Sequence, residues 1–140
     1  MARFEAKRDL AKVGKPADKQ EWMMTPPTVN AYYNPQWNEI VFPAGILQPP
    51  FFNKEATPAV NYGAMGMVVG HEVTHGFDDE GRQFDKDGNL VDWWTAESAK
   101  AFEERTACVV AQYGDYVAID DIKLNGKLTL GENTADLGGL

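Results

Sequence analysis

Apolar residues recur after Pro58 at spacings of three and four positions, up to about Gly76, and this periodicity predicts a helix. The residues on the apolar face are Val60, Ala64, Met67, Val68 and Val73. Three glycines interrupt the segment, and each lowers the helix propensity by up to ~1 kcal/mol relative to Ala. They are Gly63, Gly66 and Gly70. We therefore expect this helix to pack closely against another backbone.

The first third of the chain predicts a short helix and a β-hairpin. Residues 4–10 are expected to be helical, and Pro16 breaks the chain before a long loop. Residues 28–33 and 39–42 are rich in β-formers and flank turn-forming residues, which is typical of a hairpin.

The second half of the chain predicts two more helices. Thr95 is suited to cap a long helix over residues 96–119, and residues 81–94 look irregular. A last helix is expected to begin near residues 130–132. Together these elements predict an α+β fold that is mainly helical, with a small β-hairpin beside the central helix.

Length and composition favour one domain with a hydrophobic core. The sequence has 140 residues, of which 44% are hydrophobic and 24% are charged, as in ordinary globular proteins. Its net charge of -8, without a stripe of Lys and Arg, argues against nucleic acid as a partner. No apolar run approaches the ~20 residues that cross a bilayer, so a soluble chain without a membrane segment is expected. The compartment of a parent protein, cytoplasmic or extracytoplasmic, stays open.

Cys108 is the single cysteine, so the sequence allows no internal disulfide. Its neighbours Ala107, Val109 and Val110 are apolar, and we expect Cys108 to be a small core residue. The alternative is a cysteine that pairs with a partner outside this sequence.

The predicted central helix carries the motif His71-Glu72-Val73-Thr74-His75. Residues four apart on a helix lie within about 40° of each other, one turn along the axis. His71 and His75 can therefore direct two imidazole nitrogens at one point, where Zn²⁺ accepts nitrogen ligands at ~2.0–2.1 Å. Glu72 projects beside this pair and could reach a water molecule on the metal.

A catalytic zinc site needs a third protein ligand and an open fourth position. The best candidate is Glu132, which lies near the start of the predicted last helix. Metal-bound imidazoles usually donate their second N–H to a carboxylate or carbonyl. Asp78, just past the central helix, and Asp136, one turn after Glu132, are placed to accept these hydrogen bonds.

Each of these residues also has an ordinary structural interpretation. The HExxH motif fixes only three positions and occurs by chance on surface helices. A lone histidine is more often a satisfied core residue, and Glu132 or Asp136 alone is more often a solvated carboxylate. Both histidines of the chain nevertheless fall within the motif, which favours the metal site.

From residue 29 to residue 140 the chain resembles the catalytic core of the zinc metallopeptidase family of neprilysin, endothelin-converting enzyme and bacterial oligopeptidase O. Four blocks carry the resemblance, and they occur in the family's order. The blocks are residues 29–33 (VNAYY), 40–52 (IVFPAGILQPPFF), 69–79 (VGHEVTHGFDD) and 131–136 (GENTAD).

The resemblance implies a zinc site with one Zn²⁺ per chain. His71, His75 and Glu132 match the family's metal ligands. Glu72 matches the general base that takes a proton from a zinc-activated water.

The resemblance also implies roles for residues around the metal. Asp78 and Asp136 match carboxylates that orient the ligand histidines, and we count Asp136 with Glu72 among the catalytic residues. Asn30 and Ala31 match an edge segment that holds the backbone of a peptide substrate. An extended peptide can pair with such a strand edge.

The implied function is zinc-dependent endopeptidase action on oligopeptides, on a thermolysin-like fold. The family also has parts that this sequence does not contain, namely a helical lid domain and a later His and Arg that stabilise the transition state. We therefore expect residues 1–140 to be a truncated part of a metallopeptidase catalytic domain. Zinc binding should be more robust than cleavage, and apolar surface left uncovered should allow self-association. The alternative is a catalytically silent fragment that binds zinc or peptide.

Overall fold

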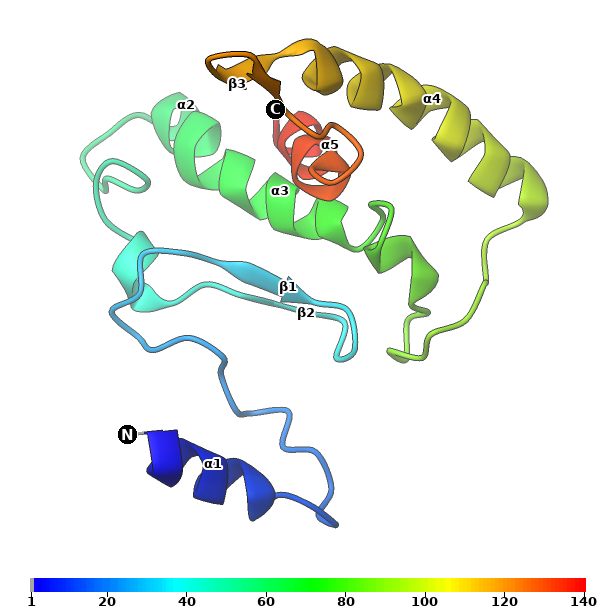
Figure 1. Cartoon of the computed structure of the whole chain (residues 1–140). Coiled ribbons are helices and arrows are strands. Elements are labelled where there is room, and N and C mark those ends of the chain that lie inside the picture. Colours follow the sequence, from blue (N-terminus) through cyan, green and yellow to red (C-terminus); the bar gives the residue numbers. More distant parts are fainter. Residues whose placement is uncertain (1) are drawn as a thin grey trace.

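One helical segment lies at the centre of the computed structural model, which describes residues 2–140 (Figure 1). The segment begins as α2 (Pro58–Asn61), continues through a π-helical stretch over Tyr62–Gly66, and ends as α3 (Met67–His75). Pro58 suits the first helical position, because the N–H that it lacks would have no partner there. The predicted central helix is confirmed, with a π-helical stretch inside it.

A β-hairpin lies along one side of α3 (Figure 1). It is formed by the antiparallel strands β1 (Tyr32–Asn34) and β2 (Glu39–Val41), in which Tyr32 pairs with Val41. Asn38 in the turn has a φ of 49°, a conformation that Asn tolerates better than most residues. The predicted hairpin is confirmed, although its strands are shorter than expected.

The hydrophobic core gathers residues of the hairpin region and of the central helix. Its buried members are Ala31, Ile46 and Met65. Phe42, Phe51 and Val68 are partly buried and pack against them. Ile46 belongs to a short 3₁₀ helix over Ala44–Ile46. This small core fixes the position of β1 relative to α3.

The last helix, α5 (Leu130–Gly139), packs against α3 on the side away from the hairpin (Figure 1). A Cβ atom on Gly70 would lie 2.9 Å from Cα of Gly139, so the two backbones approach more closely than any side chain allows. Ala135 is completely buried. The expected close packing against another backbone is therefore found at Gly70. Gly63, in contrast, faces open space.

The long helix α4 (Ala96–Asp115) crosses over α5 (Figure 1). The Thr95 hydroxyl accepts a hydrogen bond of 3.1 Å from the Ser98 N–H, so the predicted N-cap is confirmed. The predicted helix end at residue 119 is wrong. Residues Val117–Ile119 form strand β3, which pairs with β4 (Ile122–Lys123), because β-branched residues here flank a tight turn.

Cys108 is exposed, which contradicts its predicted place in the core. The face of α4 that is turned inward carries Phe102, Thr106 and Val110, which recur at helical spacing. Cys108 follows Thr106 by two positions and so points away from this face. Its thiol donates a hydrogen bond to the Arg105 carbonyl.

The remaining helix, α1 (Ala2–Leu10), has no buried residue and is joined to the hairpin by a long irregular segment (Figure 1). Residues 81–94 contain only a 3₁₀ turn over Gly81–Gln83 and an isolated bridge between Phe84 and Leu90. Within residues 2–140, no helix is both long and apolar enough to cross a bilayer. The α+β, mainly helical fold is confirmed.

Candidate metal centre

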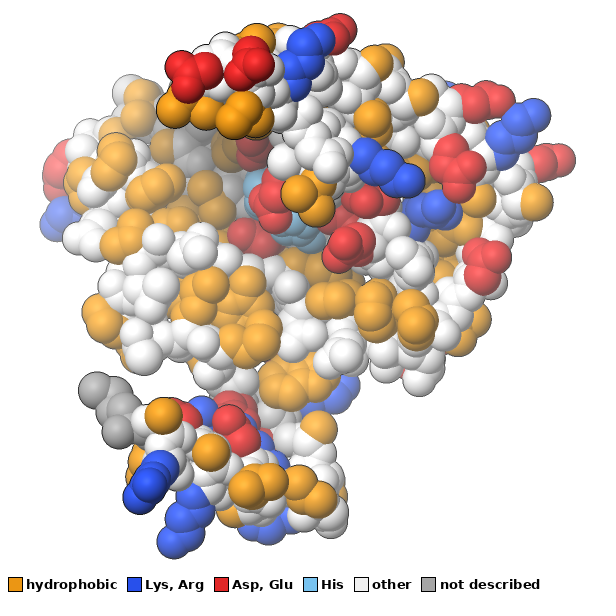
Figure 2. Space-filling view, viewed as in Figure 1, with side chains coloured by type: hydrophobic (Ala, Val, Ile, Leu, Met, Phe, Trp, Pro, Cys, Tyr) orange, Lys and Arg blue, Asp and Glu red, His pale blue; other side chains and the backbone are white. Residues whose placement is uncertain are grey.

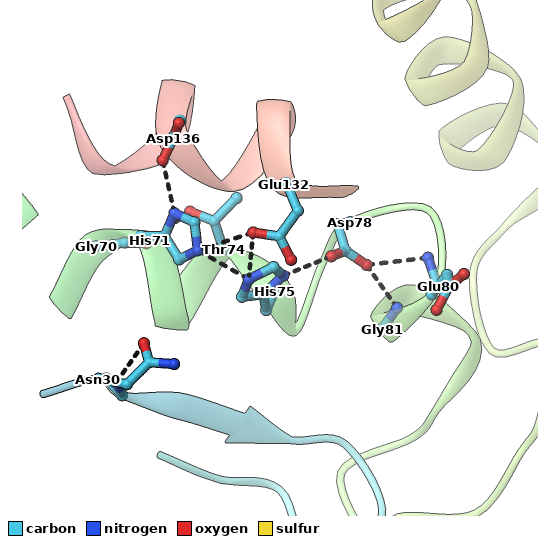
Figure 3. Close-up of polar contacts among 11 residues, drawn as sticks. Asn30, Gly70, His71, Thr74, His75, Asp78, Glu80, Gly81, Glu132 and Asp136 are labelled. Atoms are coloured by element: carbon cyan, nitrogen blue, oxygen red, sulfur yellow. Dashed lines mark hydrogen bonds and ion pairs between the residues drawn. The ribbon is translucent and has the colours of Figure 1, made fainter. Parts of the chain in front are cut away.

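α3 brings the two histidines of the motif together (Figure 3). The Nε2 atoms of His71 and His75 are 2.9 Å apart. The two rings stand nearly at right angles, with an interplanar angle of 85°. One helical turn is therefore enough to direct both imidazoles at the same point.

Glu132 approaches this point from α5, at the other side of the site (Figure 3). Its Oε2 atom is 3.4 Å from Nε2 of His71 and 3.7 Å from Nε2 of His75. The Glu132 side chain is 73% exposed. The sequence interval of nearly sixty residues between the motif and Glu132 is closed by the packing of α5 on α3.

A carboxylate lies behind each imidazole (Figure 3). The Nδ1 atom of His71 is 2.8 Å from Oδ1 of Asp136, and the Nδ1 atom of His75 is 2.8 Å from Oδ2 of Asp78. Each carboxylate can accept a hydrogen bond from the Nδ1–H group, so that the proton stays on Nδ1 and the Nε2 lone pair is free to face the site. The structure thus places each of the two sequence-predicted aspartates next to one histidine of the motif.

Asp78 is held more firmly than Asp136, because it is buried and uses both oxygens. Its Oδ1 atom accepts hydrogen bonds from the backbone N–H groups of Glu80 and Gly81, at 2.9 and 2.7 Å. A Cβ atom on Gly81 would collide with the His75 carbonyl, so only glycine lets the loop turn back here. The Asp136 side chain, in contrast, is 53% exposed.

These contacts shift two pKa values in opposite directions. Burial alone would raise the pKa of Asp78, but the hydrogen bonds from His75, Gly81 and Glu80 outweigh it and lower that pKa. The hydrogen bond to Asp78 raises the pKa of His75, against the effect of burial. Asp78 therefore stays ionised and orients the His75 ring.

Glu72 is buried like Asp78, with only 5% of its surface exposed. Burial raises its pKa, although the nearby imidazoles of His75 and His71 oppose the shift. A carboxylate with a raised pKa is a stronger base once it is ionised. This environment suits a group that takes up and releases a proton.

These side chains line a cavity of about 370 Å³ between α3, α5 and the start of β1. Figure 2 shows the histidines in a hollow of the surface, with acidic side chains around it. Asn30 and Ala31 line the same cavity, and the Ala31 N–H donates a hydrogen bond of 2.9 Å to Oδ1 of Asn30. All eight sequence-predicted site residues therefore lie in or directly behind one hollow.

Sequence reasoning did not single out three residues that shape this hollow. Tyr33 lines the cavity, and burial raises the pKa of its hydroxyl. Gly81 permits the return of the loop that holds Asp78, and Gly131 leaves room for nearby carboxylates. All three lie within or beside the motif blocks, but neither periodicity nor spacing reveals which contacts they make.

The set of donor atoms is suited to a metal cation. With each Nδ1 proton directed to its aspartate, two Nε2 lone pairs and a carboxylate oxygen face one another at 2.9, 3.4 and 3.7 Å. Such groups repel unless a positive charge lies between them. A tetrahedral ion with bonds of ~2.0–2.1 Å would separate its ligand atoms by about 3.3 Å. His71, His75 and Glu132 thus fit Zn²⁺ in both chemistry and spacing.

Comparison with known proteins yields one family. The family model for peptidase family M13 matches residues 30–140. An endothelin-converting enzyme homolog of Locusta migratoria is 55% identical over 138 residues, which cover 99% of this chain and 19% of that protein. Human neprilysin is 53% identical over 140 residues, with the same two shares. The chain therefore spans about a fifth of the length of these relatives.

Solved structures agree with this result. The zinc metalloprotease Zmp1 of Mycobacterium tuberculosis, in complex with an inhibitor, superposes with a TM-score of 0.92 and 52% sequence identity. The match covers 96% of this chain and 22% of that one. PepO of Lactobacillus rhamnosis gives a TM-score of 0.86 at 42% identity, over 91% of this chain and 20% of that one. The fold, the sequence blocks and the family match agree, and the chain belongs to peptidase family M13.

Proposed function

We propose that this chain carries the zinc site of an endopeptidase that hydrolyses oligopeptides. One observation carries the proposal: two imidazole nitrogens and the Glu132 carboxylate converge on one point, each imidazole being held from behind by an aspartate. This arrangement leaves one side of the point open to the cavity. An open fourth position distinguishes a catalytic zinc site from a structural one.

The comparisons support the proposal at the level of the family. One matched structure is named a zinc metalloprotease, and two matched relatives are named neprilysin and endothelin-converting enzyme homolog. Because the chain spans about a fifth of those proteins, we propose that residues 1–140 are one part of a larger metallopeptidase catalytic domain.

The metal ligands of this proposal are His71, His75 and Glu132. When bound, zinc would lower the pKa of a coordinated water molecule and polarise the carbonyl of the scissile bond. Asp78 and Asp136 would hold the two imidazoles with Nδ1 protonated, so that Nε2 stays a ligand. Oriented ligands need little rearrangement to bind the ion, which favours both affinity and a fixed geometry.

Glu72 would move the proton during hydrolysis. Its carboxylate takes a proton from the attacking water and delivers it to the nitrogen of the leaving amine. Burial raises its pKa, so it binds that proton more tightly than an exposed glutamate does. The same residue can then serve as base in the first half of the reaction and as acid in the second.

Asn30 and Ala31 would hold the peptide along the cavity. They lie directly before β1, whose partner strand β2 occupies only one of its edges. An extended peptide can lie along the other edge and form backbone hydrogen bonds, while the Asn30 amide offers both a donor and an acceptor. This arrangement fits oligopeptides without fixing a side-chain preference.

The metal assignment is tested by zinc content and affinity. We expect the chain to bind one Zn²⁺, and we expect Glu132→Gln to lose much of its zinc because a neutral amide oxygen is a poor ligand. Glu104→Gln, which removes an exposed charge on α4, serves as the control. Unchanged zinc stoichiometry and affinity in Glu132→Gln would exclude Glu132 as a ligand.

The reaction is tested with a fluorogenic oligopeptide, with and without a chelator. Cleavage should stop when zinc is removed and return when zinc is added. Glu72→Gln should keep zinc but lose activity, because the amide cannot accept the proton. Chelator-insensitive cleavage, or equal rates in Glu72→Gln, would contradict the mechanism.

The second candidate function is a zinc- or peptide-binding module without turnover. The metal ligands and the cavity would be the same, so zinc binding alone does not separate the two functions. Zinc-loaded chain that binds the peptide but leaves it uncut would support this second function.

A further inference from the structure

Arg82 is a cationic residue whose side chain is largely withdrawn from solvent. It lies in the 3₁₀ turn over Gly81–Gln83, and its side chain is only 18% exposed. Taking a guanidinium group out of water costs free energy unless other groups compensate its charge. The position of this side chain therefore depends on the groups around it.

The groups around the Arg82 side chain belong to the beginning of α4 and the residues just before it. The guanidinium carbon lies 5.6 Å from the centroid of the Trp94 ring and 5.2 Å from the centroid of the Phe102 ring. These two rings also pack edge to face against each other. Nη2 of Arg82 is 3.2 Å from Oε1 of Glu103, but Glu103 is 68% exposed, so this ion pair contributes little. The cation–π contacts with the two rings are therefore the main anchor.

The backbone of Arg82 closes the loop that follows α3. Its N–H donates a hydrogen bond of 3.1 Å to the Asp78 carbonyl. The two preceding residues, Glu80 and Gly81, donate their N–H groups to Oδ1 of Asp78. Three consecutive N–H groups are therefore directed at one residue, Asp78.

This loop is held at both ends. At its beginning, Oδ2 of Asp78 lies 2.8 Å from Nδ1 of His75, on α3. At its end, the Arg82 side chain contacts α4. The exposed Gln83 side chain donates a hydrogen bond to the Asp79 carbonyl, and this contact stays within the loop. Arg82 thus connects the end of the loop to a second helix.

The direction of the His75 ring depends on this loop. Asp78 has a short side chain, so its carboxylate lies where the backbone of the loop places it. A carboxylate that accepts the Nδ1–H group keeps Nε2 directed at the metal point. If the end of the loop lost its contact with α4, the three N–H groups would move and Asp78 would move with them.

We propose that Arg82 is a positioning residue for the metal centre: its side chain anchors to α4 the loop in which Asp78 is held, and Asp78 in turn directs His75. The inference rests on the proposed role of His75 as a zinc ligand. It assigns Arg82 no contact with zinc or with substrate.

The first test compares zinc titrations of Arg82→Ala and the unmodified chain under metal-buffered conditions. We expect Arg82→Ala to bind zinc roughly 10-fold more weakly, the lower end of the range for groups that orient metal ligands, because Arg82 acts through Asp78. Loss of a positive charge would by itself favour a cation, so charge alone acts in the opposite direction. Arg105→Ala removes the same charge from the exposed side of α4 and should bind zinc normally. Equal affinities in Arg82→Ala and the unmodified chain would overturn the proposal.

A pair of double variants separates positioning from general destabilisation. If Arg82 acts through Asp78, Arg82→Ala should weaken zinc binding little further in an Asp78→Ala chain. In an Asp136→Ala chain it should keep its full effect, because Asp136 contacts the other histidine. Equal effects in the two chains would overturn the proposal, since a general loss of stability acts alike in both.

Amide hydrogen exchange of the metal-free chain tests the same role without zinc. In Arg82→Ala the N–H groups of Glu80 and Gly81 should exchange faster, while those within α3 should keep their rates. Unchanged exchange at both positions would contradict an anchored loop, whatever the zinc ligands are.

A second variant keeps the test decisive if Arg82→Ala does not fold. Arg82→Lys keeps the charge but has no planar group to lie against the two rings, so we expect weaker zinc binding here too. Normal zinc affinity with normal exchange would overturn the proposal. Glu132→Gln distinguishes the two failures. If it binds zinc normally, the proposed zinc site is wrong; if it loses zinc while the Arg82 variants do not, only the positioning role is wrong.

Discussion

At the scale of single residues, the two aspartates behind the imidazoles each contact one histidine, but they differ in burial. Asp78 is buried and also stabilises the loop after α3, because it accepts hydrogen bonds from the backbone N–H groups of Glu80 and Gly81. Asp136 is exposed and contacts His71 from the surface of α5. Their removal should therefore affect zinc affinity in both cases but stability in only one.

We predict that Asp136→Ala weakens zinc binding by roughly 10–100-fold and leaves the unfolding of the metal-free chain almost unchanged. Asp78→Ala should weaken zinc binding as well, and it should also lower the free energy of unfolding by about 1–3 kcal/mol, because buried N–H groups lose their acceptor. Zinc titration and urea denaturation measure the two effects. Equal stability losses in both variants would contradict the difference in burial.

Sequence reasoning reached the histidines and the glutamate by different routes. The angle between positions four apart on a helix directly predicts that His71 and His75 converge. No local rule predicts the distance from Glu132 to them, because that distance depends on how α5 packs on α3. Its place near a helix start made Glu132 a candidate, and the family resemblance then matched it to a metal ligand.

At the scale of elements, the site depends on how closely two helices approach. Gly70 faces the Gly139 backbone, and this contact lies one residue before His71 on α3. A larger residue at position 70 would separate α3 from α5 and draw Glu132 away from the imidazoles. Packing and metal geometry are therefore coupled through a glycine that has no chemical role.

We predict that Gly70→Ala lowers both stability and zinc affinity. Its Cβ atom would lie 2.9 Å from Cα of Gly139, and overpacking of this kind costs about 1–3 kcal/mol. Gly63→Ala is the matched control, since nothing lies within 4 Å of its Cβ position and the helix should gain up to about 1 kcal/mol. Thermal unfolding and zinc titration check both variants. A Gly70→Ala chain as stable as Gly63→Ala would exclude tight backbone packing.

The elements that sequence reasoning misjudged lie where local preference and tertiary packing compete. The long helix was expected to reach residue 119 but ends at Asp115. Tyr116 adopts an extended conformation. Strand β3, which contains the β-branched residues Val117 and Ile119, then pairs with β4 across a turn at Asp120, whose φ is 51°. Cys108 has apolar neighbours in sequence, yet only every third or fourth residue of α4 faces inward. Sequence neighbours are a poor guide to burial on a helix.

At the scale of the whole molecule, the candidate ligands come from both α3 and α5. A bound ion would therefore join two helices that are otherwise held together by packing and by the contact between His71 and Asp136. Few apolar residues are buried in the described chain: besides Ala31, Ile46 and Met65 of the core, they are Tyr32, Val41, Pro43, Leu130 and Ala135. A ligand that binds only the folded state raises stability in proportion to the logarithm of its concentration.

We predict that zinc raises the free energy of unfolding by about 2.7 kcal/mol when free zinc is a hundred times its dissociation constant. Thermal unfolding with a chelator and with buffered zinc measures this difference. The gain should shrink in Glu132→Gln at the same zinc concentration, because binding is weaker. Identical melting temperatures with chelator and with zinc would show that the folded chain does not bind the ion.

The surface of the molecule carries apolar groups that nothing covers within residues 2–140. On β3 and β4 the side chains of Val117, Ile119 and Ile122 are 58%, 63% and 61% exposed. The two strands are short and form a sheet of their own, so their outer edges are unpaired in the described chain. Exposed apolar side chains next to unpaired strand edges favour association between molecules.

We predict that the chain self-associates through the β3–β4 hairpin and that Ile119→Lys reduces this association. A lysine at this edge would place charge where a second molecule must bury apolar surface, and strand edges protected by lysine resist pairing. Ala101→Lys on the exposed side of α4 makes the same change in net charge away from the hairpin and should not reduce association. Because the chain is acidic, either lysine reduces the repulsion between molecules, so charge alone would act in the opposite direction. Sedimentation velocity over a range of concentrations measures the effect, and equal behaviour of the two variants would exclude the hairpin as the contact surface.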